Sequence, residues 1–264
     1  MKPQVAGMFY PGTERAMRQQ VGELLMQADV REDLPRARAY IVPHAGLIYS
    51  GSIAALAYRH LVMHAVDIKR IVMIGPAHQM YVRGIALLDA PHYAIPGREF
   101  AIDQELRSVI MRDFAGQSEC SNRAFLQEHC LEVQLPFLGE IFQEDVEIVP
   151  ILVGYTDYQA LAGLLSTVPT DTLILISSDL SHFLTYEQAR QLDGQANDAI
   201  MNLQPEAMSM DMACGRVGIQ GLLAYAQTGS LIVNRLGQCN SGDTAGDKGR
   251  VVGYGAYHFG AGHA

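Results

Sequence analysis

Three stretches of the chain share one pattern, in which a run of β-branched and other apolar residues passes into a turn that presents a histidine. They are Ala37–Gly46, which contains His44, Arg70–His78, and Thr172–His182. Apolar runs of this length, bounded by turn residues, predict buried strands of a parallel sheet. Because sites in open α/β sheets form at the carboxyl ends of the strands, we expect His44, His78 and His182 to converge in one cleft.

Apolar residues at helical spacing separate these predicted strands. Thr13 is placed to cap a helix with one apolar face, formed by Met17, Val21, Leu24, Leu25 and Ala28. Further helices are predicted after the turn at Tyr49–Ser52, after Asp103, at Tyr158–Leu165, as two polar helices within Tyr186–Met212, and at Val217–Ala226. Further strands are predicted at Gly84–Leu88, Glu147–Val153, Leu231–Leu236 and Arg250–Tyr257. This alternation predicts one three-layer α/β/α domain over residues 1–264, around a mostly parallel or mixed central sheet.

The composition narrows the classes of function. With 264 residues and 49% hydrophobic content, the chain can bury a large core. A formal net charge of -9 argues against a nucleic-acid partner, because such partners usually meet a clustered basic face. The first residues lack the apolar core of a signal peptide, and no run reaches the roughly 18 apolar residues of a membrane helix. We therefore expect a soluble, cytoplasmic protein with no membrane partner.

The four cysteines are Cys120, Cys130, Cys214 and Cys239, and they form neither a CxxC pair nor a dense framework. This spacing favours free thiols in a reducing compartment, with a metal ligand among them as an open alternative. Cys214 precedes Gly215 at the start of a predicted apolar helix, where the helix dipole favours a thiolate. Such a cysteine can be a nucleophile or a ligand, although a cysteine taken alone is more often a small core residue.

Two polar segments carry more functional groups than a connection needs. Ser177–His182 leaves the most hydrophobic predicted strand, and we expect it to lie in the site. Glu128–Pro136 begins with a polar cluster and continues into an apolar helix, with His129 and Glu132 three residues apart and hence on one helix face. This cluster is either a solvated helix start or a second group that faces the cleft.

The remaining histidines indicate structure more than chemistry. His60 and His64 are four residues apart on one predicted helix, but the glutamate of an HExxH motif is absent, which favours surface or packing roles. His258 and His263 lie near the end of the chain, where solvent exposure explains them as well as chemistry does. Thr244–Gly249 lacks the phosphate-loop pattern and precedes a strand, so we exclude a phosphate-binding role for it.

Seven ordered motifs, spread over nearly the whole chain, point to one family. They are Ala6–Pro11, Pro43–Gly46, Gly75–His78, Glu128–Leu138, Ser177–His182, Cys214–Arg216, and Asn240–Thr244 with Val252–Tyr254. With these motifs the chain resembles the Memo family, also called AmmeMemoRadiSam system protein B, whose fold is similar to that of class III extradiol ring-cleaving dioxygenases. The resemblance implies a non-heme, metal-dependent oxidoreductase of dioxygenase type that acts on a small substrate.

The resemblance also implies a metal site. His44 and His78 correspond to two histidine ligands of one transition metal ion, with iron or copper expected and zinc as a further candidate. The dioxygenases use a glutamate as the third ligand, whereas the Memo motif places Cys214 there, and Glu206 is the nearest upstream glutamate. Two histidines and a carboxylate suit Fe(II), but a thiolate is softer and favours copper or zinc.

In the same resemblance His182 is the acid/base group, His129 faces the substrate or supports the ligands, and Asp179 orients its neighbours. An imidazole near its ordinary pKa can take a proton from a substrate hydroxyl at neutral pH.

The alternative function is that of a copper- or iron-binding protein, or a peptide-recognition protein, that uses the same cleft without turnover. A thiol hydrolase using Cys214 with His182 is a third class, but no oxyanion-hole motif supports it. Family association implies AMMECR-type and radical-SAM pathway partners.

Overall fold

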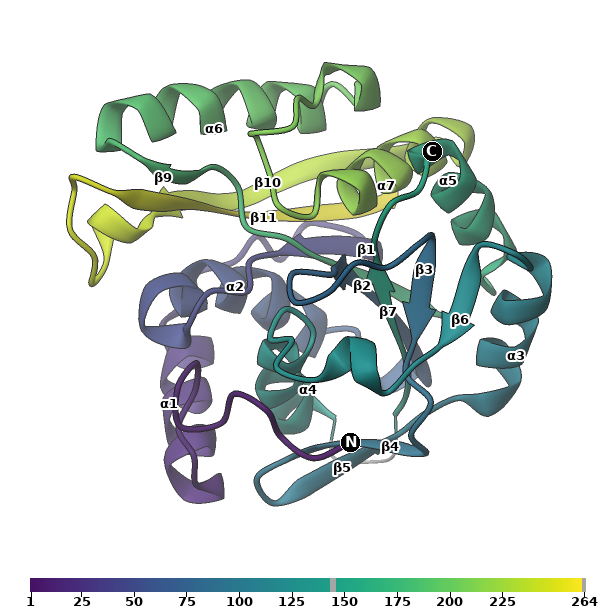
Figure 1. Ribbon diagram of the computed structural model, residues 1–264. Coiled ribbons are helices and arrows are strands. Elements are labelled where there is room, and N and C mark those ends of the chain that lie inside the picture. Colours follow the sequence, from purple (N-terminus) through teal and green to yellow (C-terminus); the bar gives the residue numbers. More distant parts are fainter. Residues whose placement is uncertain (143–145, 263–264) are drawn as a thin grey trace.

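The computed structural model describes residues 1–142 and 146–262, which form a central sheet with helices on both faces (Figure 1). Within these residues the sheet has nine strands in the order β10-β11-β1-β8-β2-β7-β3-β6, with β9 paired to β11. The strands are β1 (Ala37–Val42), β2 (Arg70–Pro76), β3 (Ile85–Leu87), β6 (Ser118–Cys120), β7 (Glu147–Val153), β8 (Leu173–Ser177), β9 (His182–Leu184), β10 (Leu231–Asn240) and β11 (Val251–Ala261). A separate hairpin consists of β4 (His92–Ile95) and β5 (Arg98–Ala101).

The four central strands run in one direction, which brings their carboxyl ends to one edge of the sheet. β1, β8, β2 and β7 pair in parallel, whereas β11 runs antiparallel to β1 and β3 runs antiparallel to β7. The register places Val42 of β1 beside Ser177 of β8, and Ile176 of β8 beside Ile74 of β2. The turns that follow β1, β2 and β8 therefore leave the sheet at the same edge, which is where the sequence predicts a site.

Helices cover both faces of the sheet. They are α1 (Glu14–Gln27), α2 (Leu47–Val62), α3 (Gln104–Asp113), α4 (Leu135–Ile141), α5 (Tyr158–Thr167), α6 (Tyr186–Met201) and α7 (Arg216–Thr228). Tyr40 and Val42 of β1 belong to a core that includes residues of α1, α2 and α4, whereas Ala39 and Ile41 belong to a second core with α3, α5, α6 and α7. This alternation is the period of two expected for a strand buried on both faces. The predicted three-layer α/β/α fold is confirmed.

Helix α2 begins earlier than the sequence predicts. It starts at Leu47, so the stretch Tyr49–Ser52 is helical and not a turn. The backbone N–H of Leu47 donates to the carbonyl of Phe9, which gives the first turn an acceptor from outside the helix. Gly51 packs against Leu24 of α1 at a distance that leaves no room for a Cβ atom, so this glycine serves the contact between the two helices.

Two other segments contain less helix than predicted. His129 lies in the loop before α4, and Glu132 opens a separate 3-10 turn, so the prediction that these two residues share one helix face is wrong. In the predicted pair of polar helices only α6 is an α-helix, and it ends at Met201. Leu203 then adopts a positive φ of 51°, and a short 3-10 turn begins at Pro205. Gln204 is not helical, as expected for the residue before a proline.

His258 is buried in β11, so the prediction of solvent exposure is wrong. β11 pairs with β1 on one side and β10 on the other, which places a residue close to the chain end in the middle of the sheet. The His258 ring lies 4.9 Å from that of His60, which is also buried and contacts the Tyr40 hydroxyl through Nδ1 at 2.6 Å. The packing role predicted for His60 is confirmed, and His263 lies outside the described residues.

Two further observations concern the whole described chain. All four cysteines are free, as their spacing predicts. No helix within residues 1–142 and 146–262 combines the length and the apolar character that crossing a membrane requires.

Candidate metal centre

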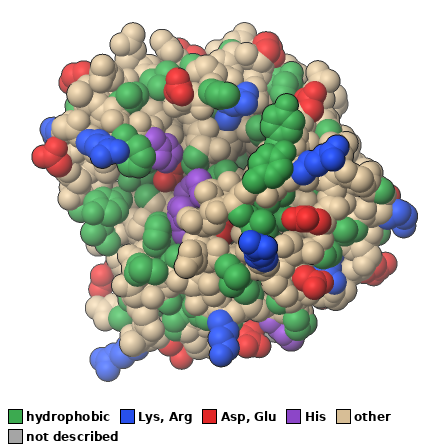
Figure 2. Space-filling model, viewed as in Figure 1, with side chains coloured by type: hydrophobic (Ala, Val, Ile, Leu, Met, Phe, Trp, Pro, Cys, Tyr) green, Lys and Arg blue, Asp and Glu red, His purple; other side chains and the backbone are tan. Residues whose placement is uncertain are grey.

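Three histidine rings meet at the carboxyl edge of the sheet. His44 follows β1, His78 follows β2, and His129 lies in the loop before α4. Each of the three offers a ring nitrogen within 4.8 Å of those offered by the other two. Figure 2 shows histidine side chains at the border of a hollow on this face, with hydrophobic side chains across it.

The hydrogen bonds around His44 determine which ring nitrogen is free. Ser177 Oγ donates its one proton to the Cys130 carbonyl at 2.6 Å and accepts a hydrogen bond from Gln134 Nε2 at 2.8 Å. His44 Nδ1 lies 3.0 Å from the same hydroxyl and must therefore carry a proton and donate it. The lone pair of His44 is then on Nε2, which lies 3.3 Å from Cys214 Sγ. His44 thus directs its one open donor atom toward Cys214.

Glu128 orients His78 in the same manner. It accepts hydrogen bonds from the backbone N–H of His78 at 2.6 Å and from His78 Nδ1 at 2.9 Å, which leaves Nε2 of His78 as the free nitrogen. Burial acts to raise the pKa of Glu128, but the hydrogen bonds from His78 and from the backbone of Cys130 outweigh it and lower this pKa to about 2. A buried, ionised carboxylate therefore faces the back of the His78 ring, the arrangement that fixes a histidine for metal binding.

Burial keeps two of the three rings neutral. It lowers the pKa of His44 to about 3, with the charge of His78 adding to the effect. It also lowers the pKa of His129 to about 4, with the charge of His44 acting in the same direction. A neutral imidazole with a free nitrogen is the form that binds a metal ion or accepts a hydrogen bond.

The ring planes limit which of the three histidines can bind one ion together. An imidazole binds a metal ion in the plane of its ring. His129 stacks on His78 with centroids 4.9 Å apart and planes only 19° from parallel, so an ion in the plane of His78 lies off the plane of His129. The plane of His44 crosses that of His78 at 81° and that of His129 at 88°, so His44 can share an ion with either of the stacked rings. The ring of His129 also packs 4.5 Å from that of Phe9.

Cys214 lies at the start of α7, next to His44. Burial raises the pKa of its thiol to about 12, and the charge of Asp179 adds to the effect. Burial therefore opposes the effect of the helix N-terminus, which by itself favours a thiolate. Asp179 is itself buried, which raises the pKa of its carboxyl, and it accepts the backbone N–H of His44 at 2.7 Å. Asp179 thus fixes the turn after β1 and not a histidine ring.

His182 opens β9 and donates its Nδ1–H to the Leu180 carbonyl at 2.8 Å, so its Nε2 is free. It lines a cavity of about 380 Å³ together with Cys214 and Met210, among others. Cys214 contacts His44 but shares no hydrogen bond with His182 among the described residues, which gives the thiol-hydrolase alternative no geometric support. Glu206 is exposed on the 3-10 turn after α6 and belongs to no metal-capable group in the described chain.

Ser177 and Glu128 lie in segments that the sequence places near the cleft, but their contacts with His44 and His78 could not be predicted. Glu128 stands in one of the seven family motifs, and its one local signal is its position directly before His129. Tyr58 donates its hydroxyl proton to Gln134 Oε1 at 2.7 Å, and Gln134 passes the connection on to Ser177 and so to His44. Gln134 is a polar residue in an apolar segment, which is a weak signal for such a role.

Comparison with known proteins identifies the family. The family model described as Memo-like protein matches residues 1–258. A MEMO1 family protein from Aquifex aeolicus is 33% identical with 96% of each chain covered, and one from Methanosarcina mazei is 30% identical with 97% of each covered. The crystal structure of uncharacterized protein JW3007 from Escherichia coli K12 has a TM-score of 0.59 at 11% identity, over 84% of this chain and 100% of that chain, which is a likeness of fold alone. The chain belongs to the Memo-like protein family, the family that its seven motifs resemble.

Proposed function

We propose that this Memo-family protein is a metal-dependent oxidoreductase of extradiol dioxygenase type that acts on a small molecule. The observation that carries the proposal is a shared arrangement of three histidines. His44, His78 and His182 each commit Nδ1–H to an acceptor of the protein and leave Nε2 free. Histidines oriented in this way are typical of metal ligands and of acid/base groups.

We propose His44, His78 and Cys214 as the ligands. Two imidazole nitrogens and a thiol that loses its proton on binding suit iron, copper or zinc. His44 Nε2 and Cys214 Sγ are 3.3 Å apart. That is near the roughly 3.5 Å expected between nitrogen and sulfur ligands of one tetrahedral ion with bonds of about 2.0 and 2.3 Å. Cys214 belongs to neither group of donors within 4.8 Å, so binding brings it closer to His78.

Three further residues have roles beside the proposed ligands. A bound ion would polarise a substrate oxygen and supply redox chemistry. His182 accepts a substrate proton at Nε2, because its Nδ1 already donates to the Leu180 carbonyl. His129 is neutral and stacked beside the ligands, where it can hydrogen-bond a substrate. Asp179 holds the turn that carries His44.

A second function, metal binding without turnover, is favoured by the donor that faces His44. The nearby carboxylate of Asp179 is directed at a backbone N–H, and the free nitrogen of His44 faces a sulfur atom instead. A sulfur ligand favours copper or zinc over Fe(II), and these ions can be held without oxygen chemistry.

Oxygen uptake by Fe(II)-loaded protein, measured with a panel of catechols, distinguishes the two functions. We expect the wild type to consume oxygen with at least one catechol, and His182→Gln to lose turnover while keeping its metal. The exposed His92 provides a control, and His92→Gln should keep both. A fully loaded wild type that consumes no oxygen with any catechol leaves metal binding as the function. Undiminished turnover in His182→Gln removes His182 from the mechanism.

A further inference from the structure

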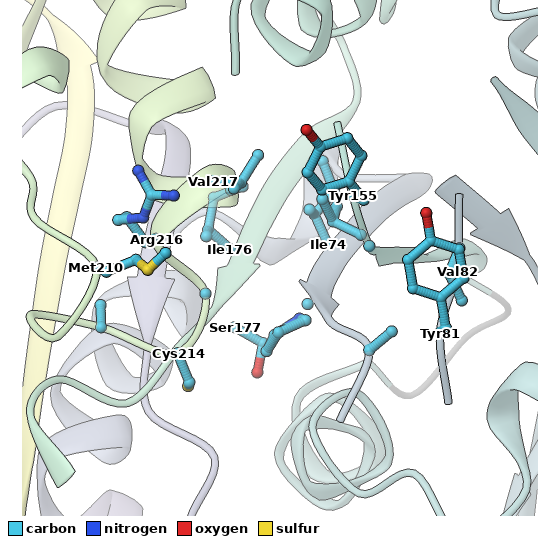
Figure 3. Close-up of a pocket in the computed structure, with 18 of the residues that line it drawn as sticks. Ile74, Tyr81, Val82, Tyr155, Ile176, Ser177, Met210, Cys214, Arg216 and Val217 are labelled. Atoms are coloured by element: carbon cyan, nitrogen blue, oxygen red, sulfur yellow. The ribbon is translucent and has the colours of Figure 1, made fainter. Parts of the chain in front are cut away.

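A cavity of about 460 Å³ opens beside the metal centre (Figure 3). Residues at the carboxyl ends of β2, β7 and β8 and at the start of α7 line it. Ser177 and Cys214 belong to this lining and also contact His44, at Nδ1 and Nε2 respectively. One end of a molecule in this cavity therefore lies against Cys214, one of the proposed ligands, and one side chain away from His44.

The one formal charge among the described residues that line the cavity is positive. Among the described residues that line it, Arg216 is the one formally charged side chain. Its Nη1 donates to the neutral Gln220 Oε1 at 2.9 Å, and no carboxylate of the described residues lies within ion-pair distance of the guanidinium. Arg216 is also the first residue of α7, so the positive end of the helix dipole lies at the same place. In a chain of net charge -9, this is a local site for an anion.

The walls of the cavity are apolar and its rim is aromatic. Tyr81, Tyr155 and Met210 line it, and yet they are 74%, 79% and 77% exposed. Figure 3 shows Tyr81 and Tyr155 on one side and Met210 and Arg216 on the other, with Cys214 and Ser177 the lowest of the labelled side chains. Exposed apolar side chains gathered at the mouth of a cavity typically mark a ligand-binding groove.

The rim on the tyrosine side is held in place by the backbone. The N–H of Tyr155 donates to the Val82 carbonyl at 2.8 Å, and the Tyr155 carbonyl accepts the N–H of Gly84 at 2.9 Å. Gly154 approaches the Val82 backbone so closely that a Cβ atom would clash with it. The backbone that carries Tyr155 is thus held by hydrogen bonds, and a flat ligand can stack on this ring without first ordering a loop.

We propose that this cavity binds a small aromatic carboxylate, with its ring between the tyrosines and Met210 and its carboxylate on Arg216. A carboxylate matches the two-pronged guanidinium, whereas a phosphate dianion would call for more cationic partners than one arginine. The proposal rests on the proposed function in one respect, because it makes the occupant the substrate that reaches Cys214 and His44. The binding itself requires no metal ion.

Titration of chelator-treated full-length protein with benzoate and 3-phenylpropionate, each compared with benzyl alcohol, tests the proposal. We expect at least one carboxylate to bind at least tenfold more tightly than the alcohol, and Arg216→Gln to remove that preference without changing the affinity for the alcohol. Arg216→Lys should keep part of the preference for the carboxylate, because the positive charge remains but the paired hydrogen bonds of the guanidinium are lost. Arg15 is exposed on α1, on the other face of the sheet, and Arg15→Gln should match the wild type.

Two results overturn the proposal. One is that neither carboxylate binds more tightly than benzyl alcohol. The other is that Arg216→Gln, with an unchanged melting temperature, binds the carboxylate as the wild type does. Because the protein is stripped of metal, a missing metal centre leaves these results unaffected, and a missing anion site leaves metal binding unaffected.

Discussion

Glu128 holds His78 at two points, accepting its backbone N–H at 2.6 Å and its ring Nδ1 at 2.9 Å. The first hydrogen bond fixes the turn after β2, and the second fixes the orientation of the His78 ring. Ser177 does the same for the ring of His44, and Asp179 does so for its backbone. Each of the two proposed histidine ligands thus has its own pair of restraints.

The charge of Glu128 should matter for metal binding. Glu128→Gln keeps the size and one acceptor oxygen but removes the ionised partner of His78. We expect metal affinity to fall roughly 10- to 100-fold, as when other second-layer partners of metal-bound histidines are changed. Competition with a metal-sensitive dye measures it. Glu119 is exposed on β6, and Glu119→Gln should bind as the wild type does; equal affinities in both variants would show that Glu128 is only structural.

Acidification should destabilise the fold through His60, which lies away from the metal centre. Burial and the charge of His258 lower the pKa of His60 to about 4 from 6.5. Between these two values the unfolded chain binds a proton that the folded chain does not, so stability is present above pH 6.5 and decreases as the pH falls. At pH 5 the loss amounts to about 2 kcal/mol for one such group.

Urea denaturation at pH 7 and pH 5 measures this loss. In His60→Gln the difference between the two pH values should shrink by about that 2 kcal/mol, because the titrating group is gone. His64 lies just after the end of the same helix and is half-buried, and His64→Gln should retain most of the pH dependence. A His60→Gln variant with the full pH dependence would contradict the assignment.

Glu132 should anchor the N-terminal segment that borders the proposed metal centre. It is buried and accepts the N–H groups of Gln4 and Val5 at 2.6 and 2.9 Å and the Tyr10 hydroxyl at 2.8 Å. Glu132→Ala leaves three donors without their acceptor, and we expect a loss of about 3 kcal/mol or more in the free energy of unfolding.

Tyr10→Phe is the matched variant, because it removes one donor and leaves the two backbone contacts in place. Its expected cost is about 1 kcal/mol. Hydrogen exchange at the backbone amides of residues 4–10 measures the same difference locally. This segment also carries Phe9, whose ring packs on that of His129. Equal losses in the two variants would mean that the backbone contacts of Glu132 contribute little.

The strand histidines could be predicted because strand ends are a local property of the sequence. His44 and His78 each follow an apolar run, and parallel pairing of those runs is enough to bring them to one edge. His258 could not be placed, because its burial depends on β11 pairing on both sides, which its position near the chain end conceals.

The residues that hydrogen-bond the two proposed histidine ligands are far from them in the sequence and could not be predicted from it. Ser177 acts on His44 from 133 positions away, and Glu128 acts on His78 from 50 positions away. The helix period suggested a pairing of His129 with Glu132, but the chain enters α4 through a 3-10 turn, and Glu132 binds the N-terminal segment instead. Neither contact has a signature in local spacing.

The most direct test of the metal centre is the stoichiometry and affinity of metal binding in four single variants, purified without oxygen or chelators. We predict that His44→Ala and His78→Ala lose the ion, that Cys214→Ala binds it much more weakly, and that His129→Ala keeps it near wild-type affinity. Loss of binding in His129→Ala together with retention in Cys214→Ala would show that the third ligand is His129 and not Cys214. Wild-type stoichiometry in His44→Ala would contradict the account altogether.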